Sequence, residues 1–246
     1  MLDRCLQLDV GNSSAKWRTL EAGVVTARGK YLPGDDMSLK VLTENANDPQ
    51  QIWISSVAGA QAEGALTQTL KRQWGVQPWF ARTAAQTNGL INSYADPGRM
   101  GVDRWLAMLG ARQKTLGRLC VVDAGSALTI DIISANGQHE GGYILPGPAL
   151  TERALLLDTD RVRFEEDACY KLNPGVSTAE AVRHGIAIAQ TGAVRLVLTQ
   201  LGITADQLMI CGGGGEILVS LLGEGVYTPD LVFEGLTLMA ESECRR

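Results

Sequence analysis

The sequence predicts an α/β protein made of two related halves, and three observations lead to that prediction. Residues 8–16 (LDVGNSSAK) and 122–131 (VDAGSALTID) each place an aspartate at the end of an apolar, strand-like run and then turn on a glycine. After each copy, short strands give way to alternating helices and strands. The two aspartates are separated by close to half of the 246-residue chain. Such a duplication predicts two α/β domains, 1–116 and 117–246, flanking a cleft; one mixed domain with two coincidental turns is the alternative.

The first half opens with three apolar runs separated by turn residues, which is the pattern of short strands. A buried strand, an amphipathic helix and another short strand follow, and a loop rich in Thr, Asn, Asp, Pro and Gly then leads into a further helix. The expected strands are residues 5–10, 15–20, 24–31, 51–57 and 77–81, and the expected helices are 61–74 and 102–116, with the loop at 82–100.

The second half repeats this order. Three strands come first, and Asn136-Gly137 is a good hairpin turn between two of them. Helices, a buried strand, a run of four glycines and a closing helix follow. The expected strands are residues 119–123, 128–134, 142–145, 207–211 and 226–227, and the expected helices are 149–157, 178–201, 216–222 and a last one from Pro229 to about 243.

Composition indicates a globular protein and argues against several classes of function. Hydrophobic residues make up 45% and charged residues 20% of the chain, unlike a disordered or fibrous protein. The net charge is -5 and the Lys and Arg residues are dispersed, whereas a general nucleic-acid binder needs them clustered. Any anionic ligand must therefore be bound by individual groups at its site and not by a basic surface.

The cysteines and the apolar segments indicate the cellular compartment in which the protein is expected. The five cysteines are widely spaced and form no C-x-x-C pair, so we expect reduced thiols, and a small buried hydrophobe at Cys5, Cys120 and Cys211. The N-terminus lacks the regions of a signal peptide. The longest apolar segment, 186–198, is shorter than the roughly 20 residues of a membrane span. We expect a cytoplasmic protein that binds neither nucleic acid nor membranes.

The two glycine turns are suited to phosphate binding. A glycine lets backbone N–H groups approach anionic oxygens, a small polar side chain adds a donor, and the carboxylate can hold a cation that bridges those oxygens. Two facing copies would hold one nucleotide. The glycine run 212–215, between a strand and a helix, is either a further nucleotide-binding turn or a packing feature; it is neither a Walker A loop nor a G-x-G-x-x-G motif.

The segment Gly101-Val102-Asp103-Arg104 lies where the long loop meets a helix. Asp103 could accept a proton from an alcohol and Arg104 could pair with a carboxylate. From spacing alone, the favoured interpretation is that Asp103 is only an N-terminal helix charge and Arg104 its surface partner. Thr178 offers a hydroxyl at a helix start, although Ser177 and Glu180 form a capping box that explains this start without a ligand.

The two histidines, His139 and His184, are far apart in sequence and have no Ser, Cys or metal-ligand pattern around them. We therefore expect no histidine-based triad and no zinc site. Carboxylates remain as the candidates for proton transfer.

Six motifs together closely resemble the type III pantothenate kinases, a family of the acetate and sugar kinase, Hsp70 and actin superfamily with its duplicated ribonuclease-H-like core. The resemblance covers nearly the whole chain in order, and Gly-x-Asp-Arg separates this family from its superfamily relatives. The motifs are Asp9-x-Gly-Asn-Ser-x-x-Lys16, Gly101-x-Asp-Arg104, Asp123-x-Gly-Ser-Ala-x-Thr129, Gly142-x-Ile-x-Pro-Gly147, Thr178 with Gly185, and Gly212-Gly213.

The resemblance implies ATP-dependent phosphorylation of the primary hydroxyl of pantothenate, the first step toward coenzyme A, by a homodimer whose substrate pocket is completed at the subunit interface. Asp103 would be the general base. Asp123 would hold a monovalent cation, K⁺ or NH₄⁺, and Asp9 would hold Mg²⁺ through ATP. The implied pantothenate-binding residues are Tyr94, Gly101, Val102, Asp103, Arg104 and Thr178; the implied ATP-binding residues are Asp9, Val10, Gly11, Asn12, Ser13, Ser14, Ala15, Lys16 and Ser126.

One position departs from the family pattern, because Ser126 stands where the family usually has threonine. Serine keeps the hydroxyl, so we expect the ATP contact to survive. Two other functions stay open at this point. One is a non-catalytic transcriptional accessory factor or nucleotide-binding regulator of the same fold, against which the intact Asp103 and Arg104 argue. The other is a sugar kinase or polyphosphatase, which would not need Gly-x-Asp-Arg.

Overall fold

The computed structural model describes residues 4–11 and 14–244 of the chain. It divides into two compact units. The first unit comprises Met1–Asn88, Tyr94–Gly110 and Leu231–Arg246, and the second comprises Gly89–Ser93 and Ala111–Asp230. Asn12 and Ser13, two of the expected ATP-binding residues, lie outside the described residues.

The first unit is built on a five-stranded mixed sheet of order β3-β2-β1-β4-β5. The three leading strands are antiparallel neighbours, whereas β1 pairs in parallel with β4, and β4 with β5. The strands are β1 (Arg4–Val10), β2 (Ala15–Glu21), β3 (Val24–Tyr31), β4 (Gln51–Ser56) and β5 (Trp79–Phe80). The helices are α1 (Asp36–Ala46), α2 (Ala60–Trp74), α7 (Leu231–Cys244) and most of α3 (Val102–Lys114), preceded by the 3-10 turn η1 (Pro97–Arg99).

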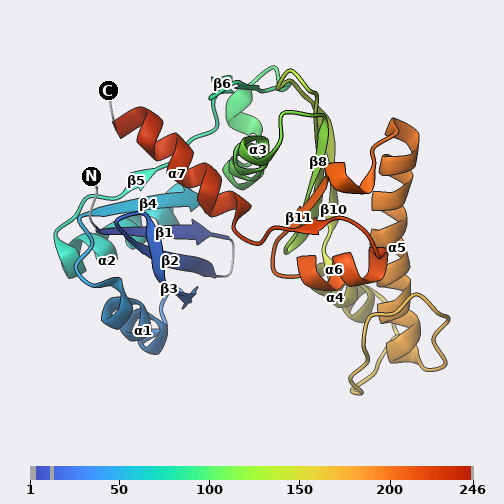
Figure 1. Cartoon of the computed structure of the whole chain (residues 1–246). Helices are drawn as coiled ribbons and strands as arrows, with labels where there is room; N and C mark the ends of the chain where they lie inside the picture. Colours follow the sequence, from blue (N-terminus) through green and yellow to red (C-terminus); the bar gives the residue numbers. More distant parts are fainter. Residues whose placement is uncertain (1–3, 12–13, 245–246) are drawn as a thin grey trace. The chain divides into compact units, whose positions relative to one another are not determined.

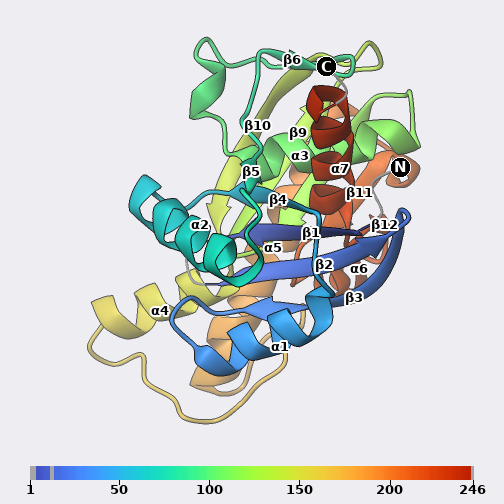
Figure 2. The ribbon, with the colours of Figure 1, turned by 90° about the vertical axis from the view of Figure 1, so that its left-hand side faces the viewer.

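Alternation along β1 gives this sheet two different faces. Leu6 and Leu8 are fully buried and pack with Leu42 of α1 and Leu70 of α2 in one apolar core. Gln7 points to the other face, where its side chain donates to Thr237 of α7 over 2.8 Å. Figures 1 and 2 accordingly show α1 and α7 on opposite sides of the strands. Asp9 shares the face of Gln7, which keeps its carboxylate out of the apolar core.

The second unit repeats the topology of the first, because its sheet has the order β10-β9-β8-β11-β12 with the same alternation of antiparallel and parallel pairs. The duplicated α/β fold expected from the sequence is thereby confirmed. The strands are β8 (Leu119–Ala124), β9 (Ala127–Ile133), β10 (His139–Pro146), β11 (Leu208–Cys211) and β12 (Val226–Tyr227); the helices are α4 (Pro148–Asp158), α5 (Thr178–Leu201) and α6 (Gly215–Leu222), with the 3-10 turn η2 (Ala205–Gln207).

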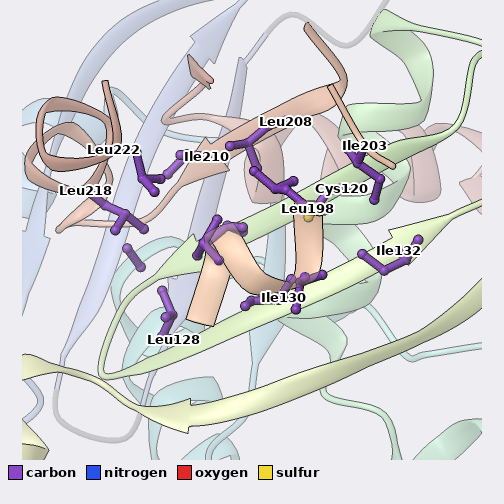
Figure 3. Close-up of a cluster of buried hydrophobic side chains, with 14 residues drawn as sticks. Cys120, Leu128, Ile130, Ile132, Leu198, Ile203, Leu208, Ile210, Leu218 and Leu222 are labelled. Carbon is purple, nitrogen blue, oxygen red and sulfur yellow. The ribbon is translucent and has the colours of Figure 1, made fainter. Parts of the chain in front are cut away.

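A second apolar core lies between this sheet and two helices. Figure 3 shows Leu198 of α5 and Leu218 and Leu222 of α6 directed toward side chains of β8, β9 and β11. Cys120 is fully buried within this cluster, as expected for a small hydrophobe, and burial raises the pKa of its thiol to about 12. Cys5 and Cys211 are also buried.

Three features differ from the sequence-based expectation. The helix α7, expected in the second half, packs against β1 and β4 of the first unit instead. The helix α1 was not expected, although Asp35 caps its start by accepting from the Ser38 backbone N–H over 2.8 Å. Two short strands, β6 (Gln86–Thr87) and β7 (Leu90–Ile91), form a ribbon within the expected loop. In the described part of the chain, no helix has the length and apolar character needed to cross a membrane.

Candidate active site

Asp9 is the last-but-one residue of β1, between two neighbouring strands. Its register partners are Lys16 on β2 and Ser55 on β4, and the Ser55 hydroxyl donates to Asp9 Oδ1 over 3.0 Å. The turn that follows is closed by a hydrogen bond from the Gly11 N–H to the Ser14 carbonyl, at 3.0 Å. Sequence reasoning found the aspartate and the lysine but missed Ser55, since no sequence signal states which strand pairs with β1 on its parallel side.

The surroundings of Asp9 raise the pKa of its carboxyl to about 6. Burial is the largest cause, and the nearby charge of Asp103 adds to it, while the hydrogen bond from Ser55 and the charge of Lys16 act in the opposite direction. Asp9 and Asp103 therefore lie close enough to repel each other when both are ionised. A cation held near both carboxylates would relieve that repulsion.

No cluster of three or more His, Cys, Asp or Glu side chains suited to a metal occurs among the described residues. The protein side chains there do not make up a complete metal cage. This donor set fits a magnesium ion that arrives with ATP and takes most of its oxygen ligands from phosphate and water, which is how Mg²⁺ is commonly bound.

The carboxylate of Asp103 is folded back against the start of α3. Its Oδ1 accepts from the Arg104 N–H over 2.8 Å, and the Gly101 carbonyl accepts from the Trp105 N–H over 3.2 Å. A Cβ on Gly101 would come within 2.6 Å of Asp103 Oδ1. A side chain at this position would therefore displace the Asp103 carboxylate from the place that it occupies beside the Arg104 N–H.

Arg104 and Tyr94 form a pair beside this carboxylate. The Arg104 Nη1 donates to the Tyr94 hydroxyl over 3.0 Å, and its guanidinium carbon lies 5.9 Å from the centre of the tyrosine ring. Arg104 is buried, with only 5% of its surface exposed, so it is not the surface charge that the alternative interpretation required. A buried guanidinium beside a phenol is well suited to bind a carboxylate.

The second glycine turn has a different set of neighbours. Asp123 on β8 is in register with Thr129 on β9 and Cys211 on β11, where the first turn has lysine and serine. The Ala124 carbonyl accepts from the Gly214 N–H over 2.8 Å, and the Gly125 N–H donates to the Ala127 carbonyl over 2.9 Å. The two repeats thus share the position of the aspartate in the sheet, but the turns differ in length and in their closing hydrogen bond, and the register partners of the aspartates differ.

Glycines from two other segments pack closely against this turn. The Gly147 N–H donates to the Ser126 carbonyl over 3.0 Å, and a Cβ on Gly147 would collide with the carbonyls of Gly125 and Ser126. A Cβ on Gly212 would collide with Asp123 Oδ1. The run 212–215 therefore serves close packing at the end of β8. Ser126 itself is exposed at the tip of the turn.

Thr178 is the first residue of α5 and is exposed. The expected cap by Ser177 is confirmed, because its hydroxyl accepts from the Glu180 N–H over 3.2 Å. The Glu180 Oε2 accepts from the Val176 N–H over 2.8 Å, one residue before the Ser177 N–H that a capping box uses. Capping explains the helix start, and the hydroxyl of Thr178 is not used for it. Thr178 belongs to the second unit, whereas Tyr94, Asp103 and Arg104 belong to the first.

One histidine lies between a serine and an aspartate, a set of contacts that sequence reasoning missed. His139 Nε2 lies 2.9 Å from Asp131 Oδ1, and its Nδ1 lies 2.8 Å from the Ser93 hydroxyl. Ser93 and His139 are 46 positions apart in the sequence, and Asp131 and His139 are 8 positions apart. Such separations carry no recognisable spacing, so only the folded chain brings them together.

Comparison with known proteins decides the family. Residues 5–200 match the family model described as type III pantothenate kinase. The chain belongs to this family. A type III pantothenate kinase from Hahella chejuensis is 36% identical over 241 residues, which cover 96% of this chain and 97% of the relative. One from Pseudomonas aeruginosa is 34% identical over 247 residues and covers 97% of this chain and 99% of the relative.

Solved structures agree on the fold of this type III pantothenate kinase family member. A protein from Campylobacter jejuni, described as a conserved putative Baf family transcriptional activator, superimposes with a TM-score of 0.61 at 24% identity, covering 98% of this chain and all of the other. A putative 2-dehydro-3-deoxygalactonokinase from Sinorhizobium meliloti gives a TM-score of 0.54 at 14% identity, covering 97% and 98%. At these identities the likeness establishes the fold and says nothing about regulation or substrate.

Proposed function

We propose that this protein transfers the terminal phosphoryl group of ATP to the primary hydroxyl of pantothenate, the first step of coenzyme A biosynthesis. The observation that carries this proposal is the arrangement at the start of α3, where Asp103 is held against Gly101 and the buried Arg104 contacts Tyr94. A sugar kinase or a polyphosphatase has no need of a buried arginine–tyrosine pair next to its base, whereas a substrate with both a hydroxyl and a carboxylate does.

Asp103 acts as the general base in this proposal. It accepts the hydroxyl proton as the substrate oxygen bonds to the γ-phosphorus and the bond to the departing ADP breaks. Because phosphoryl transfer passes through a loose transition state, alignment of the attacking oxygen matters more than basicity. Arg104 binds the substrate carboxylate, and Tyr94, Gly101, Val102 and Thr178 complete the binding surface.

The two glycine turns bind ATP in this proposal. Residues 9–16 and Ser126 supply backbone N–H groups and small polar side chains to the phosphates. Asp9 holds Mg²⁺ through ATP, and the bound ion neutralises charge on the phosphate oxygens. The raised pKa of Asp9 supports this assignment, since a carboxylate that is unfavourable on its own gains most from a cation.

Asp123 holds a monovalent cation, K⁺ or NH₄⁺. The register of this aspartate with Thr129 on β9 supports the role, because carboxylate and hydroxyl oxygens are suitable ligands for a hard cation.

The test is a coupled assay of ADP formation with ATP and Mg²⁺, with and without pantothenate, in potassium, ammonium and sodium salts at equal ionic strength. We expect turnover that requires pantothenate and is faster in potassium or ammonium. Turnover with hexoses in place of pantothenate would identify a sugar kinase. Absence of pantothenate-dependent turnover in all three salts would favour the regulator and overturn the proposal.

The role of Asp103 has its own prediction. Asp103→Asn should lower kcat by about 10² to 10⁴, the range for loss of a general base, with little change in melting temperature. Asp48→Asn is the matched control, because Asp48 is an exposed carboxylate of the same unit at a φ of 46°, which asparagine also adopts well. Near-normal turnover of the Asp103 variant would remove this residue from the chemistry.

A further inference from the structure

Ser93, His139 and Asp131 form a hydrogen-bonded line outside the residues assigned to catalysis. Asp131 and His139 are almost completely buried, at 2% and 1% exposure, whereas Ser93 is exposed. His139 begins β10, just before an irregularity in the pairing of that strand with β9, on which Asp131 lies. Two buried polar side chains are costly unless they are hydrogen-bonded, and here each satisfies the other.

The hydrogen-bond roles in this line follow from the chemistry of the three groups. A carboxylate oxygen accepts, which places the hydrogen between Asp131 and His139 on Nε2. In that tautomer Nδ1 accepts, and the Ser93 hydroxyl donates to it. The buried carboxylate thereby selects the ring tautomer that holds the serine.

The segment that carries Ser93 is fastened to the β9–β10 hairpin at several points. The Ile91 N–H donates to the Gly137 carbonyl over 2.9 Å, and Gln138 Nε2 donates to the Ile91 carbonyl over 3.5 Å. Gly137 packs so closely on the Gly89 carbonyl that a Cβ there would collide with it. The bond from Ser93 to His139 is the next attachment along the segment, and it falls on the residue directly before Tyr94.

We propose that the buried Asp131–His139 pair is a positioning device for Tyr94. By holding the Ser93 side chain, it fixes the backbone from which the Tyr94 ring reaches Arg104, the residue assigned to the substrate carboxylate. The expected consequence is a contribution to pantothenate affinity and not to ATP binding. This inference rests on the proposed function, because it takes Tyr94 and Arg104 as parts of the pantothenate site.

The contacts favour positioning over nucleophilic catalysis. In serine hydrolases of the trypsin type the carboxylate accepts from Nδ1 and the serine faces Nε2. Here the ring is reversed, with the carboxylate at Nε2 and the serine at Nδ1.

The experiment compares Ser93→Ala and Ser93→Thr with the wild-type protein in the assay described above. Ser93→Ala should raise the KM for pantothenate by about fivefold to tenfold, the loss expected for one hydrogen bond, with kcat and the KM for ATP unchanged. Ser93→Thr keeps the hydroxyl and should restore most of the affinity. Ser38→Ala is the control, because the Ser38 hydroxyl also holds a loop, by donating to the Leu32 carbonyl over 3.2 Å.

A double variant tests whether the serine acts through the histidine. Ser93→Ala should add little to the effect of His139→Gln, since both remove the same bond. If His139→Gln does not fold, the two serine variants still decide the question. An unchanged KM for pantothenate in Ser93→Ala, or an equal rise in both KM values, would overturn the inference.

Two further results would distinguish the positioning role from a nucleophilic serine and from a failure of the proposed function. Covalent labelling of Ser93 by a fluorophosphonate in the wild type, lost in the histidine variant, would mean a nucleophile and overturn the positioning role; we expect no labelling. A wild-type protein without pantothenate-dependent turnover would be a failure of the proposed function, and it is recognised before any variant is compared.

Discussion

At the scale of single residues, Asp9 has conflicting surroundings. It is held by Ser55 and faces Lys16, yet burial and the charge of Asp103 make its ionised form unfavourable. A group of this kind is expected where the protein must bind a cation, because the cost of ionisation is recovered only when the ligand is present. Stability of the ligand-free protein and function should therefore respond in opposite directions to a change at Asp9.

Asp9→Asn tests that expectation. The carboxyl pKa is 3.8 in the reference state and about 6 in the folded protein, so between these pH values the folded protein retains a proton that the unfolded chain has released. The wild-type free energy of unfolding falls as the pH rises through this window, and the variant escapes the loss.

Measured by chemical denaturation without ligands, Asp9→Asn should be more stable than the wild type by about 1 to 3 kcal/mol at pH 8, since one pKa unit corresponds to about 1.4 kcal/mol. At pH 4 most of this gain should be absent. The KM for Mg-ATP should rise in the same variant. A gain of equal size at both pH values would contradict the electrostatic cause, and Asp48→Asn should show no such dependence on pH.

At the scale of elements, the most regular patterns were predicted well and the weak ones were not. The limits of α5 and β12 agree with the expected ranges. The cap residue Ser177 marks the start of α5, and turn residues lie on both sides of β12. The helix α1 was missed although Asp35 and the apolar Leu39 and Leu42 follow helical spacing. Its polar exposed face resembles a loop in sequence, and its apolar stripe is narrow.

The second glycine turn leads to a prediction about packing between elements. Gly147 has a φ of -71°, which any residue can adopt, so the only obstacle to Gly147→Ala is the collision with the carbonyls of Gly125 and Ser126. The turn must move, and we expect a loss of about 1 to 3 kcal/mol of stability, as for overpacking, with a higher KM for ATP.

Gly192→Ala provides the matched control. Gly192 lies in α5 with open space around its Cβ position, so alanine there should leave the KM for ATP unchanged and stabilise the helix by about 0.5 to 1 kcal/mol. Thermal unfolding and ATP titrations of both variants check the pair. Wild-type behaviour of Gly147→Ala would mean that the turn is not held in place by its neighbours.

At the scale of the whole molecule, the same sheet topology occurs in both units. Each unit has an aspartate near the end of the strand that precedes its glycine turn, but the antiparallel register partner of Asp9 is Lys16 and that of Asp123 is Thr129. In the proposed function the first aspartate serves Mg-ATP and the second a monovalent cation. The residues proposed to bind pantothenate at the start of α3 lie in the chain segment between the two repeats.

A homodimer with a pocket completed by the second copy predicts a concentration-dependent activity. Light scattering after size-exclusion chromatography should give twice the chain mass of 26.3 kDa. On dilution below the dissociation constant of the dimer, the specific activity should fall and the KM for pantothenate should rise, because each site loses the part that its partner supplies. A monomer mass with full activity would contradict this assembly.

The sequence by itself determined the class of fold, the repeat and the family, because these depend on local patterns: apolar periodicity, glycine turns, and the order of six short motifs. It also identified Asp9, Asp103 and Arg104 as residues of interest. It did not decide whether Arg104 was a surface charge, and it assigned α7 to the second domain, whereas the helix packs in the first unit.

Only the tertiary structure decided the contacts between segments far apart in the chain. Ser55 reaches Asp9 through parallel strand pairing, and Ser93 meets a buried histidine from a later hairpin. The physical reason is that side-chain hydrogen bonds and close packing depend on register and on the approach of distant elements. Local sequence patterns specify neither the strand register nor which distant elements come into contact.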